Sequence, residues 1–141
     1  MADLNVRQAL VDEHMRAENE HDLEAIMATF GKDPWFELNG TQLPGVEGIR
    51  GMYDGFGFGN NGSFSDIRLD EVHRHVSEEA VILELIINGR HTGEFQGVPA
   101  SGNSFRIPAC AVFGFDDEDK VAGERVYFDG ASLMQQLGGS D

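Results

Sequence analysis

The chain has 141 residues, enough for one domain with a sizeable core, and we expect residues 1–141 to form that domain. It carries 25 acidic against 10 basic residues, which argues against binding to nucleic acid or to an anionic membrane surface, since both require positive charge. Its one cysteine excludes a disulfide within the chain, and with no long apolar run and no signal-peptide pattern we expect a cytoplasmic protein.

The first part of the chain predicts helices. Apolar residues recur at helical spacing over residues 3–18 and 21–31. Residues 33–40, "DPWFELNG", predict a short strand, because β-forming aromatic residues follow a proline. A third short helix is predicted over residues 46–58, where the apolar residues again recur every three or four positions.

The second part of the chain predicts strands. We expect them over residues 64–76, 79–88, 91–97, 104–116 and 119–129, before a short helix in the terminal "SLMQQLGG". Helices followed by a run of antiparallel strands are typical of the α+β class. We predict a sheet that curls, with the helices over its concave face and a pocket between the two layers.

The segment from Ile107 to Phe115, "IPACAVFGF", has an unusual pattern because both of its faces are apolar. A strand with one face in water should alternate apolar and polar residues. We therefore expect one face of this strand to line the pocket and the other to lie in a homodimer interface.

Several segments in chain order carry a resemblance to a known family. They are "HDLEAIMATF", "GVEGIRGMY", "HTGEFQGVPASG", "VAGERVYFD" and "LMQQLG". Together they resemble the SnoaL-like polyketide cyclase branch of the nuclear-transport-factor-2-like (NTF2-like) superfamily, which also contains ketosteroid isomerase. The resemblance implies a cone-shaped α+β fold, often a homodimer.

The same resemblance implies an activity. It points to a cofactor-free acid/base enzyme that acts on a hydrophobic carbonyl compound by aldol cyclisation, isomerisation or dehydration. The alternative is a non-catalytic module that binds a small molecule in the same pocket, because this fold serves both purposes. Neither reading involves a metal ion or a cofactor.

The resemblance places the acid/base aspartate of these cyclases at Asp129. A carboxylate that faces an apolar cavity has its pKa raised toward the range useful for proton transfer. Strand alternation puts Arg125 and Tyr127 on the same face, where Arg125 would stabilise an enolate and Tyr127 would donate a hydrogen bond. The alternatives are an N-terminal helix cap for Asp129, a salt bridge for Arg125 and ordinary packing for Tyr127.

Two histidines are candidate proton donors, because imidazole titrates near neutral pH. His14 lies beside the apolar face of the first predicted helix, and His91 begins the strand predicted over residues 91–97. The alternative for each is a buried histidine that serves packing and hydrogen bonding. The remaining candidates are expected to bind the substrate; they are Trp35, Glu37, Tyr53, Phe95 and Phe113.

Overall fold

Two helices begin the chain, whose computed structural model describes residues 2–138. Helix α1 (Leu4–Asn19) follows Asp3 and helix α2 (Leu23–Ala28) follows Asp22, and in both cases the aspartate side chain accepts hydrogen bonds from backbone N–H groups of the first turn. These donors have no partner within the helix, so each carboxylate stabilises a helix start. Both helices confirm the predicted ones.

The remaining elements confirm the α+β class. They are β1 (Phe30–Leu38), β2 (Thr41–Gln42), α3 (Gly45–Phe56), β3 (Phe64–Val76), β4 (Ala80–His91), β5 (Ser104–Phe115), β6 (Val121–Phe128) and α4 (Gly130–Gln136). Within residues 2–138 the strands form one six-stranded sheet in the order β2-β1-β6-β5-β4-β3. Its pairs are antiparallel except for β1 and β6, which run parallel.

The strand predicted over residues 91–97 is not formed. His91 ends β4, and the chain then forms a loop up to residue 103 that contains one isolated bridge, between Phe95 and Val98. Glycine and proline residues in "GEFQGVPASG" favour such a loop over a regular strand. The other predicted strands are confirmed, with small shifts at their ends.

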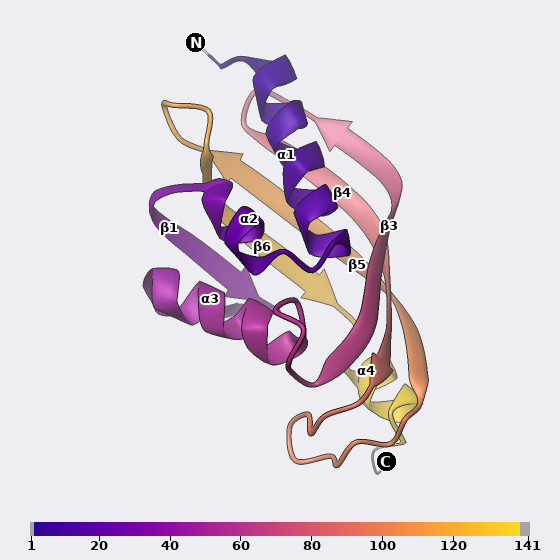
Figure 1. Ribbon diagram of the computed structural model, residues 1–141. Helices are drawn as coiled ribbons and strands as arrows, with labels where there is room; N and C mark the ends of the chain where they lie inside the picture. The colour runs from indigo at the N-terminus through magenta and orange to yellow at the C-terminus, as the bar shows by residue number, and fades with distance from the viewer. Residues whose placement is uncertain (1, 139–141) are drawn as a thin grey trace.

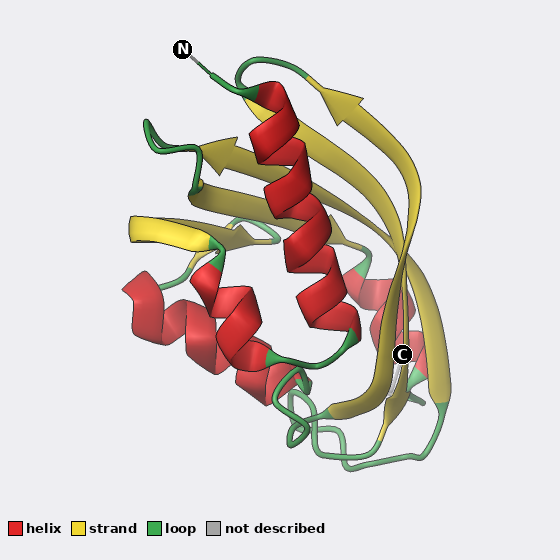
Figure 2. Cartoon of the chain, turned by 45° about the horizontal axis from the view of Figure 1, so that its top comes forward, coloured by secondary structure: helices red, strands yellow, loops and turns green. Residues whose placement is uncertain are grey.

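The sheet is curved, and α1, α2 and α3 cover its concave face (Figures 1 and 2). Side chains alternate across the sheet as the pleat requires, so that every second residue of β4 and β5 is buried under the helices. The core therefore lies between the helical layer and the inner face. None of the helices among residues 2–138 has the length and apolar character needed to cross a membrane.

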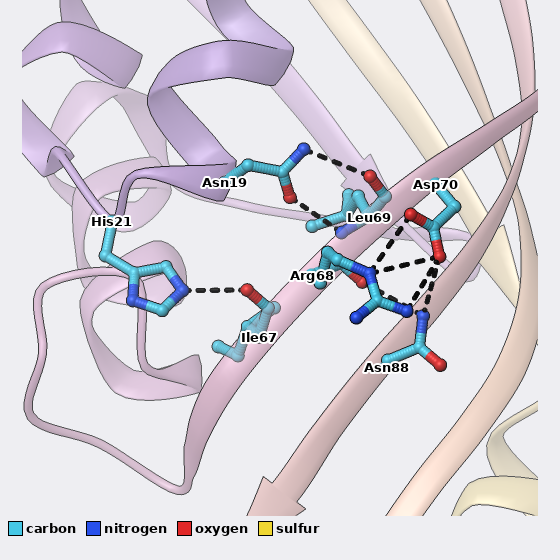
Figure 3. A network of polar contacts seen from close by, with 7 residues as sticks. All are labelled: Asn19, His21, Ile67, Arg68, Leu69, Asp70 and Asn88. Atoms are coloured by element: carbon cyan, nitrogen blue, oxygen red, sulfur yellow. Dashed lines mark hydrogen bonds and ion pairs between the residues drawn. The ribbon is translucent and has the colours of Figure 1, made fainter.

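Two polar side chains at the end of α1 fasten the helical layer to β3 (Figure 3). The side-chain amide of Asn19 donates to the carbonyl of Leu69 at 3.0 Å and accepts from its N–H at 2.7 Å. His21 Nε2 lies 2.8 Å from the carbonyl of Ile67 and donates to it. These bonds satisfy backbone groups of β3 and fix the position of α1 over the sheet.

Candidate active site

A cavity lies between the inner face of the sheet and the helices α1 and α3. The space open to the centres of water molecules measures about 60 Å³, roughly four to six times what one water needs. Half-buried side chains mark its mouth. The lining comprises Met15, Glu18, Phe36, Leu38, Met52, Tyr53, Phe56, Phe58, Leu69, Leu85, Ile87, Ala111, Phe113, Glu124, Val126 and Phe128.

Three polar side chains interrupt this apolar wall: Glu18 from α1, Tyr53 from α3 and Glu124 from β6. Each of them is at most 5% exposed. Glu124 is directed inward because it shares a strand face with Val126 and Phe128, whose side chains line the same cavity. Two carboxyl groups in such surroundings are costly unless they are neutralised or hydrogen-bonded.

His14, which is fully buried, links these polar groups. Its Nε2 atom lies 3.1 Å from the hydroxyl of Tyr53, 3.5 Å from Oε2 of Glu18 and 3.6 Å from Oε1 of Glu124. The hydroxyl of Tyr53 also lies 3.3 Å from Oε1 of Glu124 and donates to it. Residues from α1, α3 and β6 thus form one cluster joined by hydrogen bonds and ion-pair contacts, called here the acid cluster: His14, Glu18, Tyr53 and Glu124.

The tautomer of His14 follows from its second nitrogen. Nδ1 lies 2.8 Å from Oγ1 of Thr29, whose own hydroxyl donates to the carbonyl of Ile26 at 2.7 Å. The threonine oxygen is therefore left to accept, so Nδ1 carries a proton and donates it. The nitrogen that faces the two carboxyl groups, Nε2, is then the atom that takes up or releases a proton.

Burial and mutual charge shift the titration of this cluster. Burial raises the pKa of Glu124 to about 8, and Glu18 acts in the same direction against the opposing effects of His14 and of the hydrogen bond from Tyr53. Burial alone lowers the pKa of His14, but the carboxylates of Glu18 and Glu124 outweigh it and raise the pKa above its ordinary value. Burial, together with both carboxylates, raises the pKa of Tyr53 well above its ordinary value.

The raised pKa of Glu124 favours its protonated form at neutral pH, and the raised pKa of His14 makes the imidazolium more favourable than in a free histidine. An imidazolium in this position balances the charge of one carboxylate, and the second carboxyl group avoids a buried charge by keeping its proton. The cluster therefore combines a proton donor, a proton acceptor and a histidine between them. A buried carboxyl group with a strongly raised pKa beside a histidine is a feature of many acid/base sites.

Three of the candidates from the sequence lie at this site. His14 belongs to the acid cluster, Tyr53 and Phe113 line the cavity, and the ring of Phe113 packs edge-on against His14 with centroids 5.2 Å apart. The sequence thus indicated one proton-carrying residue and two lining residues of the cavity.

The expectation that Asp129, Arg125 and Tyr127 face the cavity is wrong. Asp129 is exposed and precedes α4, where its side chain accepts a hydrogen bond from the N–H of Ser132 at 3.0 Å. Arg125 and Tyr127 lie on the outer face of β6, because the inner face belongs to the alternate residues, and Tyr127 is 44% exposed. The alternative that Asp129 caps a helix describes its position in the structure. The catalytic role that the resemblance implied for Asp129 stays a prediction.

Trp35 and Glu37 also point away from the cavity. They alternate along β1 with Phe36, which is buried and lines the cavity. The ring of Trp35 lies against Gly123, where an added Cβ would come within 2.0 Å of it. The guanidinium of Arg125 lies 5.2 Å above the same ring, so these residues form a packed cluster on the outer face.

His91 and Phe95 lie together, away from the cavity lining. Phe95 packs against Phe64, with ring centroids 4.9 Å apart, and the ring of His91 also packs against Phe64, at 5.7 Å. His91 is buried, and its Nδ1 atom accepts from the backbone N–H of Ser101 at 3.2 Å. This histidine serves packing and holds the loop that follows β4.

Sequence reasoning missed Glu18 and Glu124, although each left a signal. Glu18 is four residues after His14, so it falls on the buried face of α1. Glu124 alternates with Val126 and Phe128, which are the apolar residues that a half-buried strand directs toward the core. Within residues 2–138, no group of three or more His, Cys, Asp or Glu side chains is arranged to hold a metal ion.

Comparison with known proteins agrees with this architecture. The model of the family "SnoaL-like polyketide cyclase" matches residues 7–137. No functionally curated protein matches the chain.

Several solved structures share the fold. AclR, a proposed hydroxylase from Streptomyces galilaeus, has a TM-score of 0.83 and 23% identity, over 96% of this chain and 98% of AclR. TsrD from Streptomyces laurentii has a TM-score of 0.84 and 23% identity, over 99% and 100% of the two chains. SalBIII, an epoxide hydrolase/cyclase-like enzyme with a role in pyran ring formation in salinomycin, has a TM-score of 0.73 and 20% identity, over 94% and 97%. At these identities the likeness establishes the fold alone.

Proposed function

Because the chain belongs to the SnoaL-like polyketide cyclase family, a family of cyclase-type enzymes, we propose that its cavity carries out acid/base chemistry on a hydrophobic carbonyl compound. The observation that carries this proposal is Glu124, a carboxyl group that is 3% exposed in an apolar cavity and has its pKa raised to about 8. Such a group is expensive to keep in a core, and it is well suited to deliver a proton near neutral pH.

Glu124 acts as the acid. Its proton is directed toward the carbonyl oxygen of the substrate, and this hydrogen bond stabilises the negative charge that develops on that oxygen. The interaction is strong because the cavity holds few other polar groups. The hydroxyl of Tyr53, 3.3 Å from Glu124, is a second donor in reach of the same oxygen. Its raised pKa keeps the phenol protonated, so it donates and does not ionise.

Glu18 acts as the base. Its carboxylate lines the same cavity and lies 3.5 Å from Nε2 of His14. The imidazole in turn lies 3.6 Å from Glu124, so it connects the two carboxyl groups and passes the proton from Glu18 back to Glu124 at the end of each cycle.

The reaction that fits best is an intramolecular aldol ring closure. Glu18 removes a proton from the carbon next to one carbonyl group, the resulting enolate carbon forms a bond to a second carbonyl carbon, and Glu124 protonates that carbonyl oxygen to give an alcohol. The family description names cyclases, and ring formation is also the role stated for SalBIII. Isomerisation would use the same two proton transfers without forming the carbon–carbon bond.

Proton abstraction is testable without the natural substrate. We expect the protein to accelerate the exchange of the α-protons of 2-tetralone, a hydrophobic bicyclic ketone, for deuterium in D₂O, as followed by proton NMR. Glu124→Gln keeps the shape but cannot donate the proton, so it should lower the exchange rate by about 10²–10⁴.

Asp129→Asn is the matched control, because it removes one carboxylate from the end of the same strand, outside the cavity. We expect it to leave the exchange rate unchanged. Loss of exchange in Asp129→Asn with normal exchange in Glu124→Gln would contradict the proposal and would place catalysis at the position that the family resemblance suggests. Thermal unfolding of both variants shows whether each is folded.

The second candidate is a binding module without turnover. It is favoured by the composition of the cavity wall, in which only Glu18, Tyr53 and Glu124 are polar. It is also favoured by the contacts that these groups already make: Tyr53 is hydrogen-bonded to His14 and to Glu124, and Glu18 is ion-paired with His14. Saturable binding of 2-tetralone with an unchanged rate of deuterium exchange would support this function over the enzymatic one.

A further inference from the structure

The arginines of this acidic protein fall into two groups. Five of them form an ion pair with a carboxylate; they are Arg7, Arg16, Arg50, Arg68 and Arg74. Arg90 and Arg106 form none with any residue from 2 to 138, although the chain has 25 acidic residues. Arg125 forms none either, but its guanidinium lies over the ring of Trp35. Arg90 and Arg106 have neither an ion pair nor an aromatic partner among residues 2–138, which in a protein of net charge −15 indicates a use other than internal charge balance.

Arg90 and Arg106 line one depression on the outer face of the sheet. Pairing between strands places Arg68 of β3 opposite Asn88 of β4, and Asn88 opposite Arg106 of β5. Arg90 lies two residues farther along β4, opposite Ser104, and therefore points to the same face. These five side chains surround a depression of about 450 Å³ that is open to solvent.

The surrounding residues hold the depression in shape (Figure 3). The guanidinium of Arg68 donates to Asp70 at 3.1 Å, and the amide of Asn88 donates to the same carboxylate at 3.2 Å. The Nε atom of Arg90 donates to the carbonyl of Gly102 at 3.2 Å, which leaves both terminal nitrogens of Arg90 without a partner among residues 2–138.

Helix α4 supports the third strand of the depression. The side chain of Gln136 accepts from the N–H of Arg106 at 2.7 Å and donates to its carbonyl at 3.1 Å. The backbone of Arg106 is thereby fixed, while its guanidinium forms no hydrogen bond to residues 2–138. Asp66, which also lines the depression, and Asp70 offset two of the three arginine charges, so the local charge stays positive.

We propose that this depression binds a phosphate group, either as the free ion or at the end of a small organic molecule. Terminal nitrogens of Arg90 and Arg106 approach the phosphate oxygens from two sides, with Arg68 at a third and the hydroxyl of Ser104 and the amide of Asn88 between them. The site lies on the opposite face of the sheet from the acid cluster and does not depend on the function proposed above.

Arginine chemistry favours phosphate over a single carboxylate. A guanidinium donates two parallel hydrogen bonds to a phosphate, and a phosphate offers oxygens to more than one guanidinium at a time. A phosphate monoester also carries nearly two negative charges at neutral pH. A lone carboxylate would engage one of the two unpaired arginines and leave the other unsatisfied.

The test is a titration of the wild-type chain with inorganic phosphate, at constant ionic strength, followed by proton–nitrogen NMR. We expect saturable shifts of the backbone amides of Asn88, Arg90 and Arg106. Arg106→Gln should weaken phosphate binding by about tenfold or more, because it removes charge-assisted hydrogen bonds. Phenyl phosphate should bind as inorganic phosphate does if the site takes a terminal phosphate, and more weakly if it takes only the free ion.

Arg125→Gln is the matched control, since it removes one positive charge from the same sheet face at the Trp35 stack. We expect it to leave phosphate binding nearly unchanged. An equal loss in both variants would overturn the proposal in favour of general electrostatic attraction, and equally tight binding of acetate would overturn the assignment to phosphate. Weaker self-association of Arg106→Gln, without any saturable phosphate binding, would instead show that the arginines contact a second copy of the chain.

Discussion

Strand β6 carries two carboxyl groups with opposite surroundings, one in its middle and one just past its end. Glu124 points inward, is 3% exposed and contacts Tyr53 of the acid cluster. Asp129, just past the end of the same strand, is exposed and caps α4. Burial raises the pKa of Glu124 to about 8, which makes it a proton donor near neutral pH. The comparison teaches that the strand face on which a carboxylate lies decides its chemistry, more than its place in a sequence motif.

The pH dependence of stability offers the strongest test of this difference. In the folded chain Glu124 keeps its proton up to about pH 8, whereas in the unfolded chain it loses the proton near pH 4.5. Between these values the folded state binds one more proton, so the free energy of unfolding falls as the pH rises. The contribution of Glu124 is fully present below pH 4.5 and is lost as the pH rises through 8.

Glu124→Gln should flatten this dependence. From pH 5 to pH 8 we expect the wild type to lose on the order of 3 kcal/mol more than the variant, as measured by urea unfolding at several pH values. Asp129→Asn is the control and should follow the wild-type curve. Identical curves for the wild type and Glu124→Gln would mean that Glu124 is ionised in the folded chain and that the two carboxyl groups differ less than the geometry indicates.

Most of the fold was predictable from the sequence, because local patterns determine it. Apolar residues at helical spacing identified α1, α2 and α3, and runs of β-forming residues identified the long strands. The loop after His91 was missed because His91 and Phe95 fit the alternation of a strand, whereas the glycines and the proline of "HTGEFQGVP" disfavour one. A turn of this kind depends on backbone preference more than on periodicity.

The site was predicted less well, because the prediction depended on which alternate residues of β6 face the cavity. A shift of one position moves every side chain of a strand to the opposite face. The family resemblance placed Asp129 on the inner face, and strand alternation then placed Arg125 there as well. The apolar residues Val126 and Phe128 are the ones that favour the core, and they line the cavity. Glu124 and His14 come from distant parts of the chain, so their contact could be recognised only in the folded structure.

The outer face of the sheet carries apolar residues as well as the inner one, but part of this apolar surface is exposed. Ile86 is half-buried there in a groove that also includes Val72 and Tyr127, which are 51% and 44% exposed. Exposed apolar surface of this kind is a common feature of protein interfaces. We propose that a second copy of the chain covers this groove, which is lined by other residues than the depression at Arg90 and Arg106, as the apolar character of β5 on both sides suggested.

A charged substitution tests the dimer. We expect the wild type to sediment as a dimer at tens of micromolar, and Ile86→Lys to weaken the association by about tenfold or more, since a buried unpaired charge is costly. Val6→Lys, on the exposed face of α1, should leave the dimer intact. A monomeric wild type, or equal effects of both substitutions, would show that the outer face is not the interface.

The smallest expected effect concerns the outer carboxylate itself. If Asp129 serves only as the cap of α4, Asp129→Ala should lower the free energy of unfolding by about 1 kcal/mol, whereas Asp129→Asn should change it little, because asparagine caps a helix as well as aspartate does. The rest of α4 stays anchored in both variants by the buried side chains of Leu133 and Leu137, so neither should lose the helix. Thermal and urea unfolding measure the difference between the two variants. A large loss of stability in Asp129→Asn would show that the carboxylate charge itself is needed, and the contrast between Glu124 and Asp129 would then have to be revised.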